Sequence, residues 1–259
     1  MSAFLLEAAR SRRRRVLEDR KKRPEARLRW EAGPAPERPP APPAGAFVVA
    51  EIKRASPSRG PLDPAVKAGP RAALYAGAGA GAVSVLREPD FFRGSLEDVR
   101  EAAGAVTVPV LYKDFVVDPY QFLEARWAGA SWILLIAGLL DRDLPTYIQY
   151  AQREGLLPLV EVHREAELEA ALAAGAYLVG INARNLDTLE VDPGTVRRLL
   201  LRVPPPVTAV AESGIGSPAE IGALRRLGAR GFLVGEALMR SPDPAGLLRE
   251  MVRAAEGEP

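Results

Sequence analysis

The chain of 259 residues has a formal net charge of +2 and is 47% hydrophobic, which is typical of one globular domain the size of a (β/α)8 barrel. The absence of cysteine and the single histidine exclude disulfides, cysteine nucleophiles, cysteine-based metal sites and multi-histidine metal centres. The chain has no apolar run of about 18 residues and no apolar core of a secretory signal, so we expect a cytoplasmic protein that does not enter a membrane.

The first 45 residues are predicted to form an N-terminal helix and a proline-rich connection, within one domain that spans residues 1–259. Apolar residues recur at helical spacing, at Phe4, Leu5, Ala8, Ala9, Val16 and Leu17. Basic residues crowd the same segment, at Arg10, Arg12, Arg13, Arg14, Arg15, Arg20, Lys21, Lys22 and Arg23. We interpret them as the solvated face of the helix and expect no nucleic-acid partner; a nucleic-acid-binding tail and an anion-attracting helix end are the alternatives. The prolines between Gly33 and Pro43 predict a stiff extended segment.

From Phe47 onward, strands and helices alternate. Apolar runs of strand length are predicted at Phe47–Ile52, Ala82–Leu86, Val108–Tyr112, Ser131–Ile136, Leu157–Val162, Tyr177–Asn182, Val207–Glu212 and Gly231–Gly235. Helical patterns lie between them, including Pro64–Ala78, Pro119–Ala128, Leu144–Glu154, Glu165–Ala174, Pro193–Leu201 and Pro218–Leu227. Eight such units favour a closed parallel barrel over an open doubly wound sheet, because eight strands can close and leave no edge. The predicted fold class is α/β, a (β/α)8 TIM barrel with an N-terminal helical extension.

Ionisable and amide side chains gather where five of the predicted strands end. Glu51 and Lys53 follow the first strand, Lys113 the third, Glu161 the fifth, Asn182 with Arg184 the sixth, and Glu212 with Ser213 the seventh. Parallel barrels carry their chemistry at the carboxyl ends of the strands, so we expect these groups to meet at one mouth. Internal pairing of Lys53 with Glu51 and of Lys113 with Glu161 is the structural alternative. Burying so many charges for stability alone is costly, which favours a catalytic site.

Lysine is rare in this chain, and two of its five lysines, Lys53 and Lys113, stand at strand ends. An ammonium has a tunable pKa, whereas a guanidinium stays charged, so this choice predicts proton transfer or imine chemistry. A lysine-imine aldolase with either lysine as nucleophile is therefore one alternative. A catalytically silent barrel that binds a phosphorylated metabolite or a partner is another, although the intact set of acids and lysines argues against it.

Two glycine-containing turns after the last two strands predict a phosphate site. Ser213 and Gly214 follow the seventh strand, and Gly235 and Glu236 follow the eighth. Barrels often bind phosphate with backbone N–H groups of these two loops. The polar turn Ser56–Gly60 is expected to lie over the same mouth. No nucleotide-binding fingerprint occurs, so we expect a small phosphorylated substrate and neither a cofactor nor a metal.

Four ordered segments resemble the indole-3-glycerol phosphate synthase family, and the resemblance covers essentially the whole chain. They are Glu51–Gly60, Leu111–Phe115 with Asp118–Gln121, Gly180–Leu186, and Ala211–Ile215. The resemblance implies a cofactor-free carboxy-lyase of tryptophan biosynthesis. Such an enzyme converts 1-(2-carboxyphenylamino)-1-deoxyribulose 5-phosphate into indole-3-glycerol phosphate and releases carbon dioxide and water. The oligomeric state cannot be read from the sequence, and a monomer is the working expectation.

The resemblance also implies roles for individual residues. In the catalytic group, Lys113 would be the general acid at the carbonyl oxygen, and Lys53 would share this role. Glu161 would transfer protons, and Asn182 would donate a hydrogen bond to an oxygen in the reacting region. Glu51 and Glu212 would position the lysines and the substrate hydroxyls. In the binding group, Arg184 would clamp the departing carboxylate beside Ser56, while Phe92, Phe115, Leu134 and Leu186 would form the slot for the aromatic ring. Phosphate contacts would come from Lys53, Ser213, Gly214, Gly235 and Glu236.

Three residues depart from the family pattern. Ala183 stands where many relatives have a second asparagine, Arg87 where threonine is common, and Glu236 where some relatives have serine. We expect Glu236 to use its backbone N–H and to turn its carboxylate away, because the carboxylate would repel a phosphate. His163 is expected to point the same way as Glu161 and to support it or to cap the next helix rather than to take part in catalysis.

Overall fold

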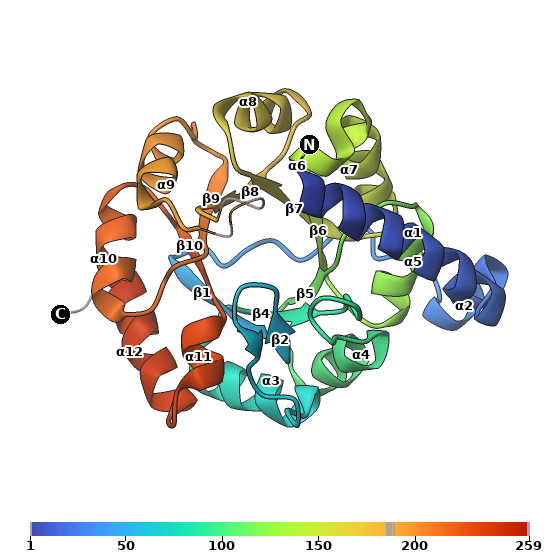
Figure 1. Ribbon diagram of the computed structural model, residues 1–259, viewed down its shortest axis with the longest axis horizontal. Coiled ribbons are helices and arrows are strands. Elements are labelled where there is room, and N and C mark those ends of the chain that lie inside the picture. The colour runs from blue at the N-terminus through green and yellow to red at the C-terminus, as the bar shows by residue number, and fades with distance from the viewer. Residues whose placement is uncertain (1, 185–187, 189, 258–259) are drawn as a thin grey trace.

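A computed structural model of the chain describes residues 2–184, 188 and 190–257. Eight strands form a closed barrel (Figure 1), in the order β1 (Phe47–Ile52), β4 (Ala82–Leu86), β5 (Val110–Lys113), β6 (Trp132–Ile136), β7 (Leu157–Val162), β8 (Leu178–Asn182), β9 (Thr208–Glu212) and β10 (Gly231–Val234). Neighbouring strands are parallel, and β10 pairs with β1 to close the ring. The predicted (β/α)8 barrel is confirmed.

Helices surround the barrel on its outside (Figure 1). They are α3 (Ala68–Gly77), α4 (Leu96–Ala105), α5 (Tyr120–Trp127), α7 (Leu144–Arg153), α8 (Glu165–Ala173), α9 (Pro193–Leu200), α10 (Pro218–Arg226) and α12 (Pro244–Glu256). Shorter helical turns lie at α6 (Ala137–Leu140), η1 (Asp141–Asp143) and α11 (Glu236–Arg240). The start of α4 has a local sequence signal, a serine at the N-cap position. Ser95 precedes it, and its hydroxyl accepts the Asp98 N–H as an N-cap.

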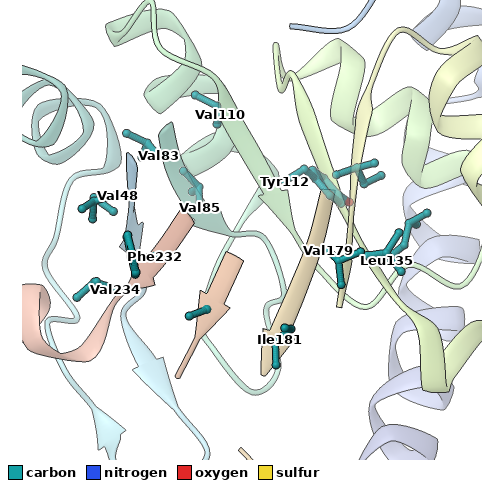
Figure 2. Close-up of a cluster of buried hydrophobic side chains, with 14 of the residues drawn as sticks. Val48, Val83, Val85, Val110, Tyr112, Leu135, Val179, Ile181, Phe232 and Val234 are labelled. Carbon is teal, nitrogen blue, oxygen red and sulfur yellow. The ribbon is translucent and has the colours of Figure 1, made fainter. Parts of the chain in front are cut away.

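The apolar core has two layers because successive strand residues point to opposite faces. Val48, Val83, Val85 and Leu135 belong to the layer between the strands and the helices, part of which Figure 2 shows. The alternate residues fill the barrel interior and include Phe47, Val49, Leu111, Trp132, Leu159, Val210 and Leu233. This alternation decides which side chain at each strand end faces the barrel axis.

The N-terminal segment differs from the single helix that we expected. It forms α1 (Ala3–Lys22) and α2 (Glu25–Ala32), separated at Pro24, whose ring disfavours helical backbone in the residue before it. The stretch from Gly33 to Pro43 contains neither helix nor strand, as predicted. In Figure 1, α1 crosses one end of the barrel beside α5 and α6.

Two expectations about α1 are wrong. Leu17 was assigned to the apolar face, but it is 56% exposed. Arg12 was assigned to the solvated basic face, but it is only 1% exposed and lies among carboxylates of the barrel. Most of the other basic residues of the segment are exposed, so the interpretation as a solvated face fails mainly at Arg12.

Proline explains two shifted boundaries. The helix predicted from Pro64 begins at Ala68, because an earlier start would place Pro70 in the helix interior, where it clashes with the preceding turn. The third strand begins at Val110 rather than Val108, after Pro109, which lacks a backbone N–H. The polar turn after β1 is a small hairpin of β2 (Ala55–Ser56) and β3 (Gly60–Pro61). Within the described residues, no helix is long and apolar enough to cross a membrane.

Candidate active site

The inward-facing positions of the strands change from apolar to ionisable at one end of the barrel. On β1 the inward series runs Phe47, Val49, Glu51 and then Lys53 just beyond the strand. The same series brings Lys113, Glu161, Asn182 and Glu212 inward from β5, β7, β8 and β9. The interior therefore ends in a layer of charged and amide groups at the carboxyl ends of the strands.

These groups line a cavity of about 810 Å³. Every candidate site residue that the structure describes lies on its wall: Glu51, Lys53, Ser56, Phe92, Lys113, Phe115, Leu134, Glu161, Asn182, Arg184, Glu212, Ser213, Gly214, Gly235 and Glu236. Leu186, which we predicted for the aromatic slot, lies outside the described residues. The wall also includes Phe4 and Glu88, which the sequence analysis did not propose as site residues.

Lys113 lies between two carboxylates. Its Nζ is 3.2 Å from Glu161 Oε2 and 3.5 Å from Glu212 Oε2. Burial alone would lower the pKa of Lys113, but the carboxylates of Glu161, Glu212 and Glu51 outweigh burial and raise it above its usual range. Lys113 is thus a charged donor at neutral pH. This position suits a general acid and argues against a neutral amine nucleophile.

Glu161 and Glu212 hold one proton between them at neutral pH. Burial raises the pKa of Glu212 to about 8, against the attraction of Lys113 and with the help of the neighbouring Glu161. Burial also acts on Glu161, but Lys113, His163 and a hydrogen bond from Asn182 lower its pKa overall. Burial and the nearby charge of Glu161 keep the proton on Glu212, whereas Lys113 keeps Glu161 ionised.

This pair predicts a pH-dependent effect of Glu212→Gln on stability. A carboxyl whose pKa is about 8 when folded and near the ordinary 4.5 when unfolded costs the protein stability as pH rises between these values. Glutamine does not ionise and therefore has no such cost. The melting temperature of Glu212→Gln minus that of wild type should increase from about pH 4.5 to about pH 8 and stay constant above about pH 8. We expect a gain of roughly 5 °C at the alkaline end. Exposed Glu250→Gln is the control. A constant offset at all pH values would contradict the assignment.

A second ion pair lies across the cavity mouth. Lys53 Nζ is 2.7 Å from Glu51 Oε1, and the Ser84 hydroxyl donates to Glu51 Oε2 at 3.3 Å. Burial opposes ionisation of Glu51, but Lys53 and Lys113 outweigh it and lower the pKa of Glu51. Both pairings named as the structural alternative are therefore present. They do not remove the lysines from the cavity, because both lysines also lie on its wall.

At two positions, glycine is needed because a larger side chain would collide with these charged groups. A Cβ added at Gly180 would lie 2.0 Å from Glu212 Oε1, and one added at Gly235 would lie 2.5 Å from Glu51 Oε1 and 2.9 Å from Lys53 Nζ. Gly235 was predicted to admit a phosphate to the backbone. The structure adds a second reason for glycine there, which is room for the ion pair.

Gly180→Ala is expected to reduce kcat/KM by about a hundredfold, because the new methyl group displaces the Glu212 carboxyl from Lys113. Gly104→Ala is the matched control, since Gly104 lies in α4 and an added Cβ meets nothing within 4 Å. Steady-state kinetics of both variants would measure the difference. Equal activity of the two variants would show that Glu212 can move without consequence.

The predicted phosphate end of the cavity combines an unusual backbone with a neutralised carboxylate. Ser213 and Gly214 adopt φ angles of 65° and 77°, in the left-handed region, and both residues line the cavity. Glu236 Oε1 lies 3.0 Å from Arg59 Nε of the β2–β3 hairpin and 3.8 Å from Arg240 Nη1. The carboxylate that we expected to turn away is thus held by arginines.

Aromatic rings line the other side of the cavity. The rings of Phe92 and Phe115 lie 6.3 Å apart, and Phe4 of α1 lies 5.9 Å from Phe115. Leu134 of β6 completes the wall next to them. The spacing of apolar residues predicts only that Phe4 lies on the apolar face of the N-terminal helix, because nothing local indicates that this helix reaches the cavity.

His163 lies where the sequence suggested, beside Glu161 and at the start of α8. Its Nε2 is 3.4 Å from Glu161 Oε1, and its backbone N–H donates to Glu167 Oε2 at 2.8 Å. Across the part of the chain that the structure describes, no three histidine or acidic side chains form a group that could hold a metal ion.

The comparison with protein families agrees with this geometry. The family model "Indole-3-glycerol phosphate synthase" matches residues 7–251. The chain belongs to the indole-3-glycerol phosphate synthase family. Similar relatives are indole-3-glycerol phosphate synthases of a Nocardioides species, 50% identical over 209 residues and 80% of each chain, and of Ruminiclostridium cellulolyticum, 47% identical over 204 residues and 78% of each chain. The predicted family resemblance is confirmed.

A solved structure shows the fold alone. Thiamine phosphate pyrophosphorylase from Pyrococcus furiosus superposes with a TM-score of 0.62 at 19% sequence identity, covering 82% of this chain and 96% of that chain. At this identity the likeness supports the barrel and says nothing of the reaction.

Proposed function

We propose that this chain catalyses the reaction of its family, the conversion of 1-(2-carboxyphenylamino)-1-deoxyribulose 5-phosphate into indole-3-glycerol phosphate. The observation that carries the proposal is the position of Lys113. It is a half-buried, charged lysine between two buried carboxyls, one ionised and one protonated, on the wall of a cavity that aromatic rings also line. Membership in the family names the reaction that this arrangement serves.

Ring closure needs an acid at the ketone. The aromatic carbon that bears the carboxylate attacks the ketone carbon, and the ketone oxygen takes a proton from the Lys113 ammonium. Loss of carbon dioxide then returns the bonding electron pair to the ring, which becomes aromatic again. The positive charge of Lys113 is maintained by Glu161 and Glu212, so it also stabilises the developing alkoxide.

Dehydration needs a second acid and a base. The new hydroxyl leaves as water after taking a proton from an ammonium, for which Lys53 is the second candidate. The adjacent carbon loses a proton to the Glu161 carboxylate, which is ionised at neutral pH. Protonated Glu212 and the Asn182 amide are donors that can hold Glu161 in place for this step. Glu51 holds Lys53 at 2.7 Å in the same way.

The remaining predicted residues bind the substrate. Phe92, Phe115 and Leu134 form the slot for the aromatic ring, together with Leu186 from the sequence pattern. Arg184 and Ser56 take the carboxylate side, since a guanidinium matches a carboxylate in shape and charge. Phosphate is bound by Lys53, Ser213 and the backbone at Gly214, Gly235 and Glu236, with Arg59 neutralising the Glu236 carboxylate.

The test is an assay of the purified chain with the carboxyphenylamino substrate. We expect indole fluorescence to appear together with one carbon dioxide per product. Borohydride should trap no substrate on the protein. A trapped adduct on Lys53 or Lys113 would favour the imine aldolase, and tight binding without turnover would favour a silent barrel.

We also propose that residues 1–259 act as one monomeric domain in the cytoplasm. The described site residues all lie on one cavity of one chain, so a second subunit is not required to complete the site. Sedimentation of the purified chain and fractionation of cells would test these two statements.

A further inference from the structure

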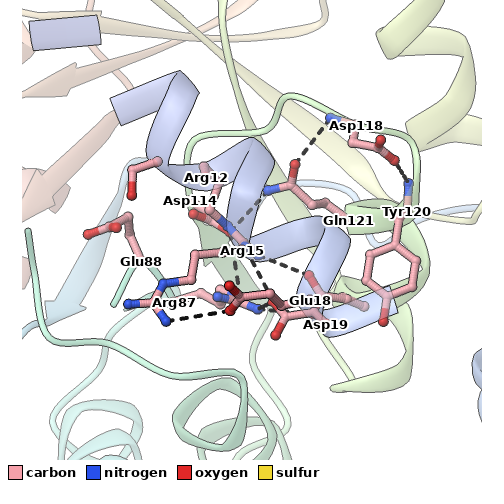
Figure 3. Close-up of polar contacts among 12 residues, drawn as sticks. Arg12, Arg15, Glu18, Asp19, Arg87, Glu88, Asp114, Asp118, Tyr120 and Gln121 are labelled. Atoms are coloured by element: carbon pink, nitrogen blue, oxygen red, sulfur yellow. Dashed lines mark hydrogen bonds and ion pairs between the residues drawn. The ribbon is translucent and has the colours of Figure 1, made fainter. Parts of the chain in front are cut away.

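Charged residues of α1 and of the barrel beside it form a second ion-pair group, mostly buried, apart from the charged layer at the strand ends (Figure 3). We call Arg12, Asp19, Arg87, Asp114 and Glu124 the buried ionic cluster. The side chains of Arg12 and Asp114 are 0% exposed. None of the catalytic steps above uses this cluster.

Arg12 joins α1 to two elements of the barrel. Its Nε lies 2.7 Å from Asp114 Oδ2, just beyond β5, and its Nη2 lies 3.0 Å from Glu124 Oε2 on α5. Its Nη1 lies 3.3 Å from Asp19 on α1 itself. One guanidinium therefore contacts three carboxylates, which is possible because its donors form a rigid fork.

Arg87 makes the reciprocal connection from the barrel to α1. It follows β4, and its Nη2 lies 2.6 Å from Asp19 Oδ2 and 3.0 Å from Glu124 Oε1. Arg87 is the second cation of the cluster, so the carboxylates of Asp19 and Glu124 are each shared by two guanidinium groups.

Asp114 links the cluster to the site, because it stands in the chain between Lys113 and Phe115. Its Oδ2 accepts from Arg12 and also from the Tyr112 hydroxyl at 3.0 Å and from Gln121 Nε2 at 3.1 Å. Its Oδ1 accepts the Phe115 N–H at 2.9 Å. The carboxylate thus fixes the backbone between the proposed general acid and the aromatic slot.

Stability alone does not account for this arrangement. Buried ion pairs are often no better than apolar packing of the same volume, since each charge must be desolvated. α1 already packs on the barrel through Leu5, Ala8 and Ala9. It also has a partly exposed ion pair between Arg20 and Asp118 at 2.6 Å. What the cluster adds to these contacts is a fixed geometry around Asp114.

We propose that Arg12 is a positioning residue of the reaction. By holding Asp114, it sets Lys113 against Glu161 and Glu212 on one side and Phe115 in the aromatic slot on the other. The N-terminal helix thereby determines the distance between the acid and the ring that it acts on. This inference rests on the proposed function of the site.

The test compares Arg12→Met with Arg20→Met, which removes the other ion pair between α1 and the segment after β5 without touching Asp114. All assays are run at a temperature well below the melting midpoint of every variant. The number of folded sites in each sample is determined by titration with the product, and kcat is expressed per folded site. We expect Arg12→Met to lower kcat by about tenfold or more and Arg20→Met by less than about twofold. Arg12→Lys, which can keep one of the contacts, should fall between Arg12→Met and wild type.

The outcomes separate the two proposals. No turnover by the wild-type chain would contradict the proposed function. Wild-type turnover with an unchanged kcat in folded Arg12→Met, or an equal loss in Arg20→Met, would contradict the role of Arg12 alone. If neither Arg12 variant folds, Arg12 is a folding residue and the positioning role is wrong.

Discussion

Replacing Lys113 with methionine is expected to lower kcat by about a thousandfold or more while the barrel still folds. Methionine keeps the length and apolar stem of the side chain but has no proton to give to the ketone oxygen. It also removes the positive charge that lies 3.2 Å from Glu161 and 3.5 Å from Glu212. Both the acid and the electrostatic stabilisation of the alkoxide are lost together. Single-turnover measurement of indole formation would report the chemical steps directly.

Two further lysine variants serve as controls for Lys113→Met. Lys67 is exposed at the start of α3, so Lys67→Met should keep wild-type kinetics. Lys53→Met should raise KM as well as lower kcat, because Lys53 is proposed to contact phosphate in addition to donating a proton. A larger loss of kcat in Lys53→Met than in Lys113→Met would exchange the roles of the two lysines. Wild-type kcat in Lys113→Met would eliminate the proposed mechanism.

The barrel and the meeting of the charged groups at its mouth could be predicted from the sequence because both follow from one alternation. Glu51 and Lys53 continue the inward series of Phe47 and Val49, and the same rule applies to Lys113 after Leu111. Parallel strands in a closed barrel bring their carboxyl ends to one mouth, so local patterns are sufficient to place groups that are far apart in the chain. The use of lysine rather than arginine at two strand ends, Lys53 and Lys113, further indicated proton transfer or imine chemistry at this mouth.

The role of the N-terminal helix could not be predicted in this way. Arg12 belongs to a run of similar basic residues, and its partners Asp114 and Glu124 lie 102 and 112 positions further along the chain. No periodicity within α1 distinguishes Arg12 from its exposed neighbours, because its burial depends on how the helix packs across the barrel end. Phe4 was not assigned to the cavity for the same reason. Pro24 and Pro70, by contrast, were local signals of helix boundaries that were present in the sequence.

Glutamine substitutions of Glu161 and Glu212, the two carboxyls beside Lys113, are expected to separate their functions. Glu161→Gln removes the only member of the pair that is ionised at neutral pH, so kcat should fall by about a thousandfold at every pH. Glu212→Gln resembles the protonated form that Glu212 already has at neutral pH, so kcat should stay within about tenfold of wild type. Rate profiles from about pH 6 to about pH 10, with folding monitored in parallel, would measure both effects.

The alkaline side of these profiles gives the sharper test. As pH rises through about 8, wild-type Glu212 loses its proton and becomes a second carboxylate beside Lys113. That carboxylate makes Lys113 a weaker acid and repels the Glu161 carboxylate, so wild-type kcat should decline there. Glutamine cannot ionise, so the decline should be absent in Glu212→Gln. If the variant keeps the same alkaline decline, the titrating group is another residue, and the proton of the pair does not lie on Glu212.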